Sequence, residues 1–236
     1  MRFLRGSLSL ALFACFGVGG LLLSLLVLPF VRSRKRGLAC VVALWRILVR
    51  GFQVTGLTRA VCENPRPVKG SVIVANHPSL IDVVFLTVLL PNTISVAKRE
   101  LRRNPFIGRI VRQIFLSDGE TFLEEGKALL AEGYNVLIFP EGTRSPADGG
   151  LHPFKRGAAH LALQAGAPLL PVFIRPTRRL VGKGQPIWHM GRERVLFRIR
   201  LDEPIPPGTV VAADSPSAAR LLTERLEKRF AFVIRH

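Results

Sequence analysis

The sequence predicts an α/β protein with a mixed, largely parallel sheet flanked by helices, preceded by an N-terminal helical segment embedded in a membrane. Two observations carry this prediction. Short apolar runs alternate with helical stretches after residue 70, which is the pattern of strands joined by crossover helices. An uncharged apolar run from Ser7 to Val31 is long enough to cross a hydrocarbon core. We therefore expect a membrane helix and an amphipathic interfacial helix in residues 1–53, and one globular domain in residues 54–236.

The N-terminal apolar run favours a membrane helix over a cleaved signal peptide. It exceeds the usual length of a signal-peptide core, and the basic flank at residues 32–36 (RSRKR) is unlike a small-residue cleavage site. Two arginines precede the run and four basic residues follow it, so the positive-inside bias favours a cytoplasmic position for the rest of the chain. We expect the inner, cytoplasmic membrane, with the globular domain on its cytoplasmic side.

The next segment has the pattern of an amphipathic helix. Apolar residues recur at three- and four-residue steps opposite Arg46 and Arg50. They are Leu38, Val41, Val42, Trp45, Leu48, Val49 and Phe52. This helix either lies in the lipid interface or packs on the globular domain, and amphipathicity alone does not separate the two.

A turn-rich break at residues 63–70 precedes the alternating elements of the globular domain. The predicted strands are Ser71–Ala75, Thr93–Ala97, Gln113–Ser117, Asn135–Phe139, Leu169–Ile174 and Val195–Leu201. The predicted helices are Ser79–Leu90, Thr121–Ala131, Gly157–Ala165 and Pro216–Phe232. Residues 175–183 are predicted to form a basic loop.

The charge balance indicates an anionic partner. Thirty-four Lys and Arg against sixteen Asp and Glu give +18, which suits a membrane surface, a phosphate-bearing substrate or a nucleic acid. A nucleic-acid partner is not expected, because the chain has one tyrosine and no recognition module. The three cysteines and five histidines lack the spacing of a metal site, so we expect no metal and no disulfide framework.

The first motif that carries chemistry is NHPSLID at residues 76–82. It follows a buried-type strand, so His77 falls at the carboxyl end of that strand, where open α/β sheets place ligands. Pro78 is expected at the first helical position, with Asp82 one turn further on. A carboxylate that accepts one imidazole N–H leaves the other nitrogen free as a base. The alternative is a histidine that caps a turn beside a solvated aspartate.

The second motif is PEGTRS at residues 140–145, after the strand Asn135–Phe139. A guanidinium, two hydroxyls and a flexible glycine come together here, a combination suited to binding a phosphate. Glu141 is expected to orient Arg144. The alternative is a generic turn without a ligand.

Together the two motifs resemble the glycerolipid acyltransferase family, whose best-known members acylate 1-acylglycerol-3-phosphate. The resemblance extends from about Ser71 to Ile174. It implies that His77 is the general base and Asp82 its orienting carboxylate. It also implies that Glu141, Gly142, Thr143 and Arg144 form the turn that binds the acceptor's phosphate.

The resemblance further implies a direct transfer. Acyl-CoA or acyl-carrier protein serves as co-substrate, with no other cofactor, no metal and no acyl-enzyme. The segment Leu170–Val172 is similar to the family block that lines the acyl-donor end. The chain has no Gly-x-Ser-x-Gly elbow for a serine nucleophile, which agrees with this expectation.

The segment KREL at residues 98–101, followed by PFIG at 105–108, is similar to the family's second region, where Lys98 lies near the phosphate. Lys155, at the start of a predicted helix, either extends this anionic site or is a solvated charge. Many relatives carry an arginine just after the next strand, whereas this chain has Asp118.

The expected function is thus a membrane-bound O-acyltransferase that acylates a lysophospholipid, most simply 1-acylglycerol-3-phosphate to give phosphatidic acid. Because of Asp118, another lyso-lipid such as a lyso-aminolipid is an alternative acceptor. A membrane-surface protein that keeps the fold without activity is the non-enzymatic alternative. The expected partners are membrane lipid and the acyl donor.

Overall fold

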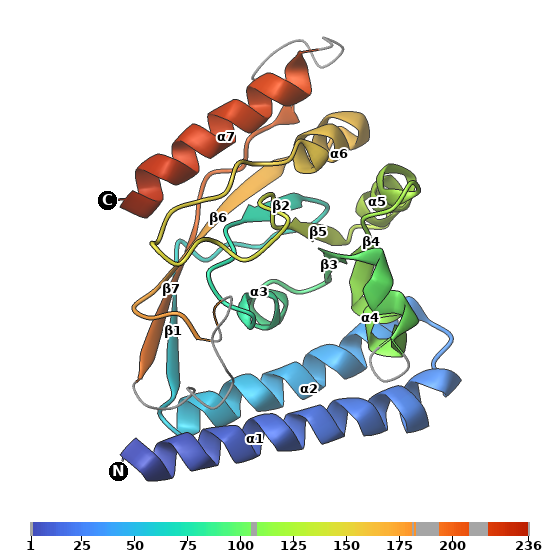
Figure 1. Cartoon of the computed structure of the whole chain (residues 1–236). Helices are drawn as coiled ribbons and strands as arrows, with labels where there is room; N and C mark the ends of the chain where they lie inside the picture. Colours follow the sequence, from blue (N-terminus) through green and yellow to red (C-terminus); the bar gives the residue numbers. More distant parts are fainter. Residues whose placement is uncertain (1, 105–107, 181, 183–193, 208–216, 236) are drawn as a thin grey trace.

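A seven-stranded sheet forms the centre of the computed structural model, which describes residues 2–104, 108–180, 182, 194–207 and 217–235 (Figure 1). The strand order is β1-β7-β6-β2-β5-β3-β4, and of the neighbouring pairs in this described sheet every one except β6–β7 is parallel. The predicted mixed, largely parallel sheet is therefore confirmed. The strands are β1 (Thr58–Glu63), β2 (Val72–Ala75), β3 (Thr93–Ala97), β4 (Phe115–Ser117), β5 (Asn135–Ile138), β6 (Leu169–Pro176) and β7 (Val195–Leu201).

Helices cover both faces of the sheet (Figure 1). On one face lie α5 (Phe122–Ala131), α6 (Gly157–Ala165) and α7 (Ala218–Arg235). On the other face lie α2 (Arg34–Val54), α3 (Asp82–Leu89) and α4 (Gly108–Ile114). The short helix η3 (Arg99–Arg103) follows β3. The central strands β2 and β5 are buried at every residue, as expected of parallel strands covered on both faces.

The N-terminal helices pair along the edge of the domain. Helix α1 (Arg2–Leu22) continues through a π-helical turn, η1 (Leu23–Val27), and a 3-10 turn, η2 (Leu28–Phe30), before the chain reverses into α2. Figure 1 shows α1 running antiparallel to α2 on the side of α2 away from the sheet. The two helices approach closely, since a Cβ on Gly51 of α2 would lie 2.5 Å from the Leu12 side chain of α1.

The apolar stripe of α2 packs on the globular domain, whereas Arg46 and Arg50 on its opposite side are exposed. Its apolar side chains belong to the same hydrophobic core as the sheet. In the folded chain the helix therefore packs on the globular domain through its apolar stripe. Two stretches, Gly6–Phe30 and Arg34–Val54, are long and apolar enough to cross a membrane, as judged by length and composition. The α1 stretch is the one that remains largely uncovered by protein.

Three elements were not predicted, namely β1, α4 and the short helix η3. Strand β1 pairs with β7 at the sheet edge, before the turn-rich break, and its alternating pattern is short enough to be missed. Helix α4 ends at Ile114, so the strand predicted to begin at Gln113 begins at Phe115 instead. The predicted segment Pro105–Ile107, most of the basic loop beyond Leu180, and Pro216 lie outside the described residues.

Candidate active site

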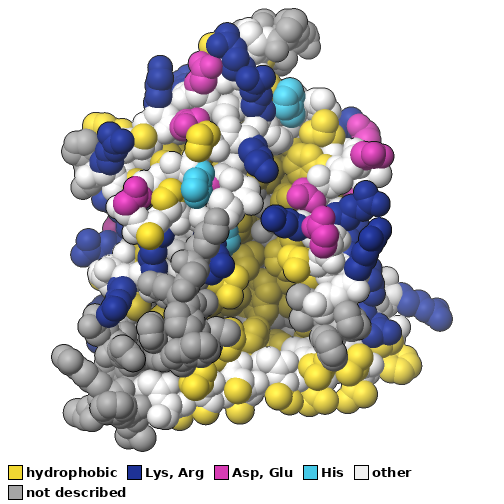
Figure 2. All heavy atoms as spheres, viewed as in Figure 1, with side chains coloured by type: hydrophobic (Ala, Val, Ile, Leu, Met, Phe, Trp, Pro, Cys, Tyr) yellow, Lys and Arg dark blue, Asp and Glu magenta, His cyan; other side chains and the backbone are white. Residues whose placement is uncertain are grey.

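The polar residues singled out from the sequence lie at one edge of the sheet. His77 follows β2, the PEGTRS segment follows β5, and Lys98 follows β3. These strands are parallel neighbours in the order β2-β5-β3, so their carboxyl ends meet at the same edge. Figure 2 shows a hydrophobic hollow in this side of the molecule, with basic side chains along its rim. The hollow extends toward the N-terminal helices at the lower edge of the view.

His77 and Asp82 form a close pair. The Nδ1 atom of His77 lies 3.0 Å from Asp82 Oδ2, and the same oxygen accepts the backbone N–H of Ser79 at 2.6 Å. The Asp82 side chain is fully buried, whereas the His77 side chain is 17% exposed. The interpretation of Asp82 as a solvated residue is therefore wrong. With Nδ1–H donated to the carboxylate, Nε2 keeps its lone pair and can take a proton.

The turn between these residues differs from the prediction. Helix α3 begins at Asp82, not at Pro78, and Ile81 precedes it as the N-cap. Residues 76–81 form an irregular turn, because the Asp82 carboxylate binds the Ser79 N–H and draws the chain back on itself. Ser79 is also buried, and its hydroxyl accepts the backbone N–H of Leu180 at 3.1 Å. The tight turn is what brings Asp82 back to His77.

Burial raises the pKa of the Asp82 carboxyl above its usual value. The hydrogen bonds from His77 and from the Ser79 N–H, together with the positive charge of Arg179, act in the opposite direction. The second carboxylate oxygen, Oδ1, is buried and has no hydrogen-bond partner among the described residues. The ionised form of Asp82 is thus stabilised by these few contacts. The hydrogen bond from His77 is the strongest of them, and it becomes stronger when His77 takes a proton.

The His77 ring is held on its face as well as at its edge. It stacks on Phe139, the residue after β5, with ring centroids 4.1 Å apart and planes inclined by 19°. The backbone N–H of His77 donates to Glu141 Oε1 at 3.2 Å and to Ser145 Oγ at 3.1 Å. Its carbonyl accepts the N–H of Ser145 at 2.8 Å. The second motif therefore fixes both the backbone and the ring of the first.

Glu141 has a structural position within the second motif. It is 4% exposed, and its carboxylate accepts hydrogen bonds from the His77 N–H, the Ser145 hydroxyl at 2.5 Å and the His152 N–H at 2.9 Å. A buried carboxylate engaged in this way orders the loop, and it would repel a phosphate placed next to it. Glu141 was expected to bind the substrate, but its contacts place it to position the neighbouring residues of the loop instead.

The middle of the second motif lies nearer the surface. Gly142 is exposed and has a left-handed conformation (φ 66°), while Thr143 and Arg144 are half-buried. The side chain of Lys155 lies over Gly142, with its Nζ 2.8 Å from the place that a Cβ on Gly142 would occupy. The backbone N–H of Lys155 donates to the Pro140 carbonyl, which ties the two segments together. Lys98 is exposed at the end of β3, the strand next to β5.

Three further residues support the site and were not singled out from the sequence. The Asn76 amide bridges to β6, donating to the Ile174 carbonyl and accepting its N–H, both at 2.8 Å. Arg179, from the loop after β6, donates to the Ser145 carbonyl at 2.8 Å. Phe139 supplies the stacking surface described above. Asn76 and Phe139 stand inside or beside the two motifs, so their proximity was a usable signal, whereas nothing marks Arg179.

The site contains a histidine oriented by a buried carboxylate. Such a pair activates a hydroxyl that a substrate supplies. Cationic side chains on the neighbouring loop favour an anionic substrate. The fold and the site therefore define a class of α/β transferase in which an external hydroxyl attacks an activated group.

Comparison with known proteins specifies this class. The family model described as Acyltransferase matches residues 61–175. The 1-acyl-sn-glycerol-3-phosphate acyltransferase of Limnanthes alba is 28% identical over 215 residues, which cover 83% of this chain and 69% of that protein. The human 1-acyl-sn-glycerol-3-phosphate acyltransferase beta is 31% identical over 182 residues, or 72% of this chain and 64% of that protein.

A solved structure extends the likeness to the whole chain. The crystal structure of the 1-acyl-sn-glycerophosphate (LPA) acyltransferase PlsC from Thermotoga maritima superposes with a TM-score of 0.75 and 26% identity, covering 100% of this chain and 97% of that one. On these matches this chain is an acyltransferase of the 1-acylglycerol-3-phosphate acyltransferase-like type. The resemblance drawn from the two motifs is thereby confirmed.

Proposed function

We propose that this enzyme transfers a fatty acyl group from acyl-CoA or acyl-carrier protein to the free hydroxyl of 1-acylglycerol-3-phosphate at a membrane surface, giving phosphatidic acid. The observation that carries the proposal is the His77–Asp82 pair beside a loop with Arg144 and Lys155. The names of the related acyltransferases support this acceptor. No cofactor other than the acyl donor is needed for the reaction.

The chemical step follows from the orientation of His77. Nε2 takes the proton of the acceptor hydroxyl as its oxygen attacks the thioester carbonyl, and the imidazolium is stabilised by Asp82. Collapse of the tetrahedral intermediate breaks the carbon–sulfur bond. The departing thiolate takes the proton back from Nε2, so the products are an ester and a free thiol, and His77 returns to its starting state.

The acceptor's phosphate is assigned to the loop after β5. In a glycerol phosphate the reacting oxygen is four bonds from phosphorus, a span of about 5 Å. Strand β5 is the immediate neighbour of β2, and adjacent strands lie about 5 Å apart, so this loop is at the matching distance from His77. Arg144, Thr143 and the ammonium of Lys155 over Gly142 supply the donors, and Lys98 adds charge from the next strand.

The same strand spacing bears on Asp118, the residue that stands where many relatives carry an arginine. This residue follows β4, three strands from β2, or about 14 Å. A carboxylate at that distance has a small effect on a phosphate held beside His77. A lyso-aminolipid acceptor remains the alternative, since an exposed carboxylate at residue 118 can pair with a lipid amine.

Contact with the membrane is assigned mainly to the N-terminal helices. Leu26 and Phe30, at the end of this segment, are 63% and 83% exposed, and Val18 and Leu22 of α1 are also exposed. Figure 2 shows hydrophobic side chains along the lower edge of the molecule, where α1 lies in Figure 1. Burial of such a surface in lipid is favourable, and basic residues 32–36 after it suit an anionic leaflet. We propose the cytoplasmic side of the inner membrane.

Thiol release tests this function. Membranes that contain the protein are given acyl-CoA or acyl-carrier protein with a panel of lyso-lipids, including 1-acylglycerol-3-phosphate and a lyso-aminolipid. We expect release that depends on 1-acylglycerol-3-phosphate and is lost in His77→Ala. Thiol release that depends on the lyso-aminolipid would show that this lipid, and not 1-acylglycerol-3-phosphate, is the acceptor. A folded, membrane-bound protein that is inactive with every combination of donor and lyso-lipid would indicate an inactive scaffold.

A further inference from the structure

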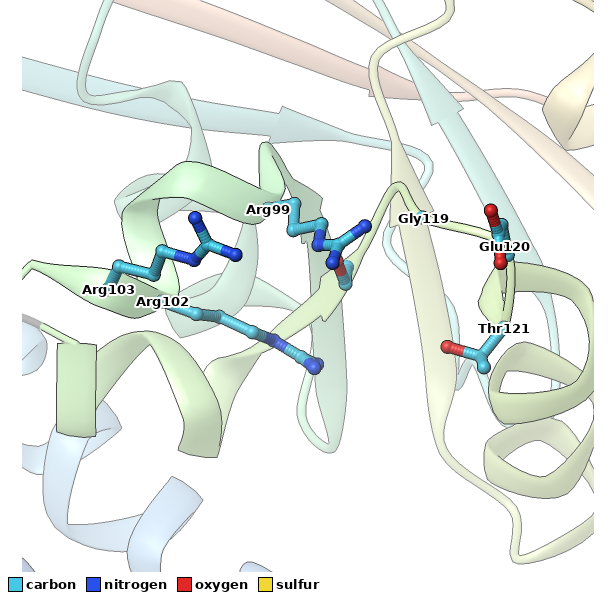
Figure 3. Close-up of a pocket in the computed structure, with 7 residues that line it drawn as sticks. Arg99, Arg102, Arg103, Gly119, Glu120 and Thr121 are labelled. Atoms are coloured by element: carbon cyan, nitrogen blue, oxygen red, sulfur yellow. The ribbon is translucent and has the colours of Figure 1, made fainter.

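A positively charged cavity lies at the carboxyl ends of β3 and β4, away from the His77–Asp82 pair (Figure 3). Its volume is about 400 Å³, which is within the range of small-ligand sites. Figure 3 shows the guanidinium groups of η3 facing the loop that connects β4 to α5. The lining residues are Arg99, Arg102 and Arg103 on the η3 side and Ser117, Gly119, Glu120 and Thr121 on the other.

The cavity has charge available for a ligand. Three guanidiniums against the single carboxylate of Glu120 give its lining a net charge of +2 (3 − 1). Arg102 is engaged, since its Nη2 donates to the Phe115 carbonyl at 3.3 Å and to Glu125 at 3.4 Å. The side chains of Arg99 and Arg103 make no hydrogen bond or ion pair within the described part of the chain.

The two walls of the cavity are fixed to each other. The backbone N–H of Arg99 donates to Asp118 Oδ1 at 2.9 Å, and the N–H of Asp118 donates to the Ala97 carbonyl at 3.2 Å. These bonds tie the start of η3 to the end of β4. The site is therefore formed before any ligand binds, which lowers the entropic cost of holding an anion. The carboxylate of Asp118, unexplained by the acceptor site, has a structural role here.

The cavity is too far from His77 for the acceptor's phosphate. From β2 the order β5-β3-β4 places it two to three strand spacings away, or about 10–14 Å. The acceptor's phosphate is only about 5 Å from the reacting hydroxyl. A second anion at this greater distance belongs to a longer substrate.

The acyl donor has the required length. In a 4′-phosphopantetheine arm about thirteen bonds separate the thioester sulfur from phosphorus, and at roughly 3.5 Å per three bonds the extended arm spans about 15 Å. We propose that Arg99 and Arg103 bind the phosphate of the donor's 4′-phosphopantetheine arm, an inference that rests on the proposed function. Acyl-CoA and acyl-carrier protein share this group, so one cavity serves both donors.

Donors with and without the phosphate test this assignment. The ratio of kcat/KM for acyl-CoA to that for acyl-pantetheine, which lacks the phosphate, is measured with 1-acylglycerol-3-phosphate for wild type, Arg99→Gln and Arg103→Gln. We expect each variant to lower the acyl-CoA value about tenfold while the acyl-pantetheine value stays within about twofold, because one charge-assisted bond is lost. Arg109→Gln, an exposed charge on neighbouring α4 outside the cavity, is the matched control and should leave the ratio unchanged.

A second variant fills the cavity without changing its charge. In Gly119→Leu the new Cβ would lie 3.6 Å from Ser117 Oγ and 3.8 Å from Arg99 Cδ, which are ordinary contact distances, and the rest of the side chain adds apolar bulk to the cavity lining. It should lower the same ratio. Equal losses for both donors would overturn the proposal, and so would a rise confined to the KM of the acceptor.

Two further measurements are needed, one with acyl-carrier protein as the donor and one with the wild-type enzyme. If the arginine variants lose activity with acyl-CoA but not with acyl-carrier protein, the cavity binds the nucleotide phosphates, and the assignment to the pantetheine arm is wrong. Turnover of acyl-pantetheine by wild type tests the proposed function separately. Absence of turnover with every donor would refute that function, whereas turnover without discrimination between donors would refute only the subsite.

Discussion

Replacing Asp82 by asparagine tests whether the buried carboxylate stabilises the charged form of His77. An asparagine oxygen can still accept the Nδ1–H, so the ring orientation is kept while the negative charge is removed. A full imidazolium 3.0 Å from the carboxylate gains about 5 kcal/mol at an effective dielectric constant of roughly 20. About half of this charge has developed in the transition state, which gives about 2–3 kcal/mol, or a loss of roughly 30- to 160-fold in kcat.

The assay is thiol release at saturating acyl donor and acceptor, for wild type, Asp82→Asn, His77→Ala and the double variant. Since Asp82 acts only through His77, adding Asp82→Asn to His77→Ala should cost nothing further. A double variant that is again at least tenfold slower than His77→Ala would refute the assignment of Asp82 as the orienting partner. A fully active Asp82→Asn variant would show that the charge is not needed.

The same variant has an expected effect on stability. Because burial raises the pKa of Asp82 in the folded protein, the folded state holds its proton more tightly than the unfolded state does. The free energy of unfolding of wild type therefore falls as pH rises from the ordinary carboxyl range toward the raised value. The free energy of unfolding of Asp82→Asn does not fall in this way, because asparagine does not titrate. Denaturant midpoints in detergent should favour the variant more at neutral pH than at acid pH, and the opposite trend would contradict the direction of the shift.

Three further predictions concern the scaffold. Asn76→Ala should lower the free energy of unfolding by about 2–3 kcal/mol, because the Ile174 N–H and carbonyl lose their buried partner; denaturant midpoints measure this. Gly142→Ala should cost about 1 kcal/mol of stability and raise the acceptor's KM without changing that of the donor, because the methyl group strains the turn and displaces Lys155. Replacing Leu26 and Phe30 by glutamate should reduce flotation with lipid vesicles while activity on a detergent-dispersed acceptor persists.

Strands β2 and β5 were predictable from sequence because their burial is complete. The predicted ranges of β3 and β7 agree with the structure, and those of β2 and β5 differ by a single residue at one end. Continuous apolar runs between turns leave little choice of conformation. The edge strand β1 was missed because half of its side chains face solvent, so its pattern is weak. The junction of α4 and β4 was misplaced because both elements are short.

The polar contacts of the site were only partly predictable. The spacing of His77 and Asp82 suggested a pair, yet the turn that joins them is irregular rather than the first turn of a helix. Its shape depends on a tertiary contact, the Ser79 hydroxyl with the Leu180 N–H, which no local pattern encodes. The arginine cavity was equally hidden, because it forms only when η3 and the β4–α5 loop meet across the sheet edge.

The structure gives a physical reason why the two motifs occur together. Glu141 and Ser145 of the second motif bind the backbone of His77, and Phe139 supports its ring, so the proposed base is held by the segment that also carries the proposed phosphate-binding loop. In the proposed mechanism one strand spacing matches the span between the reacting hydroxyl and its phosphate, and the two further spacings to β4 match the longer reach proposed for the donor's phosphate.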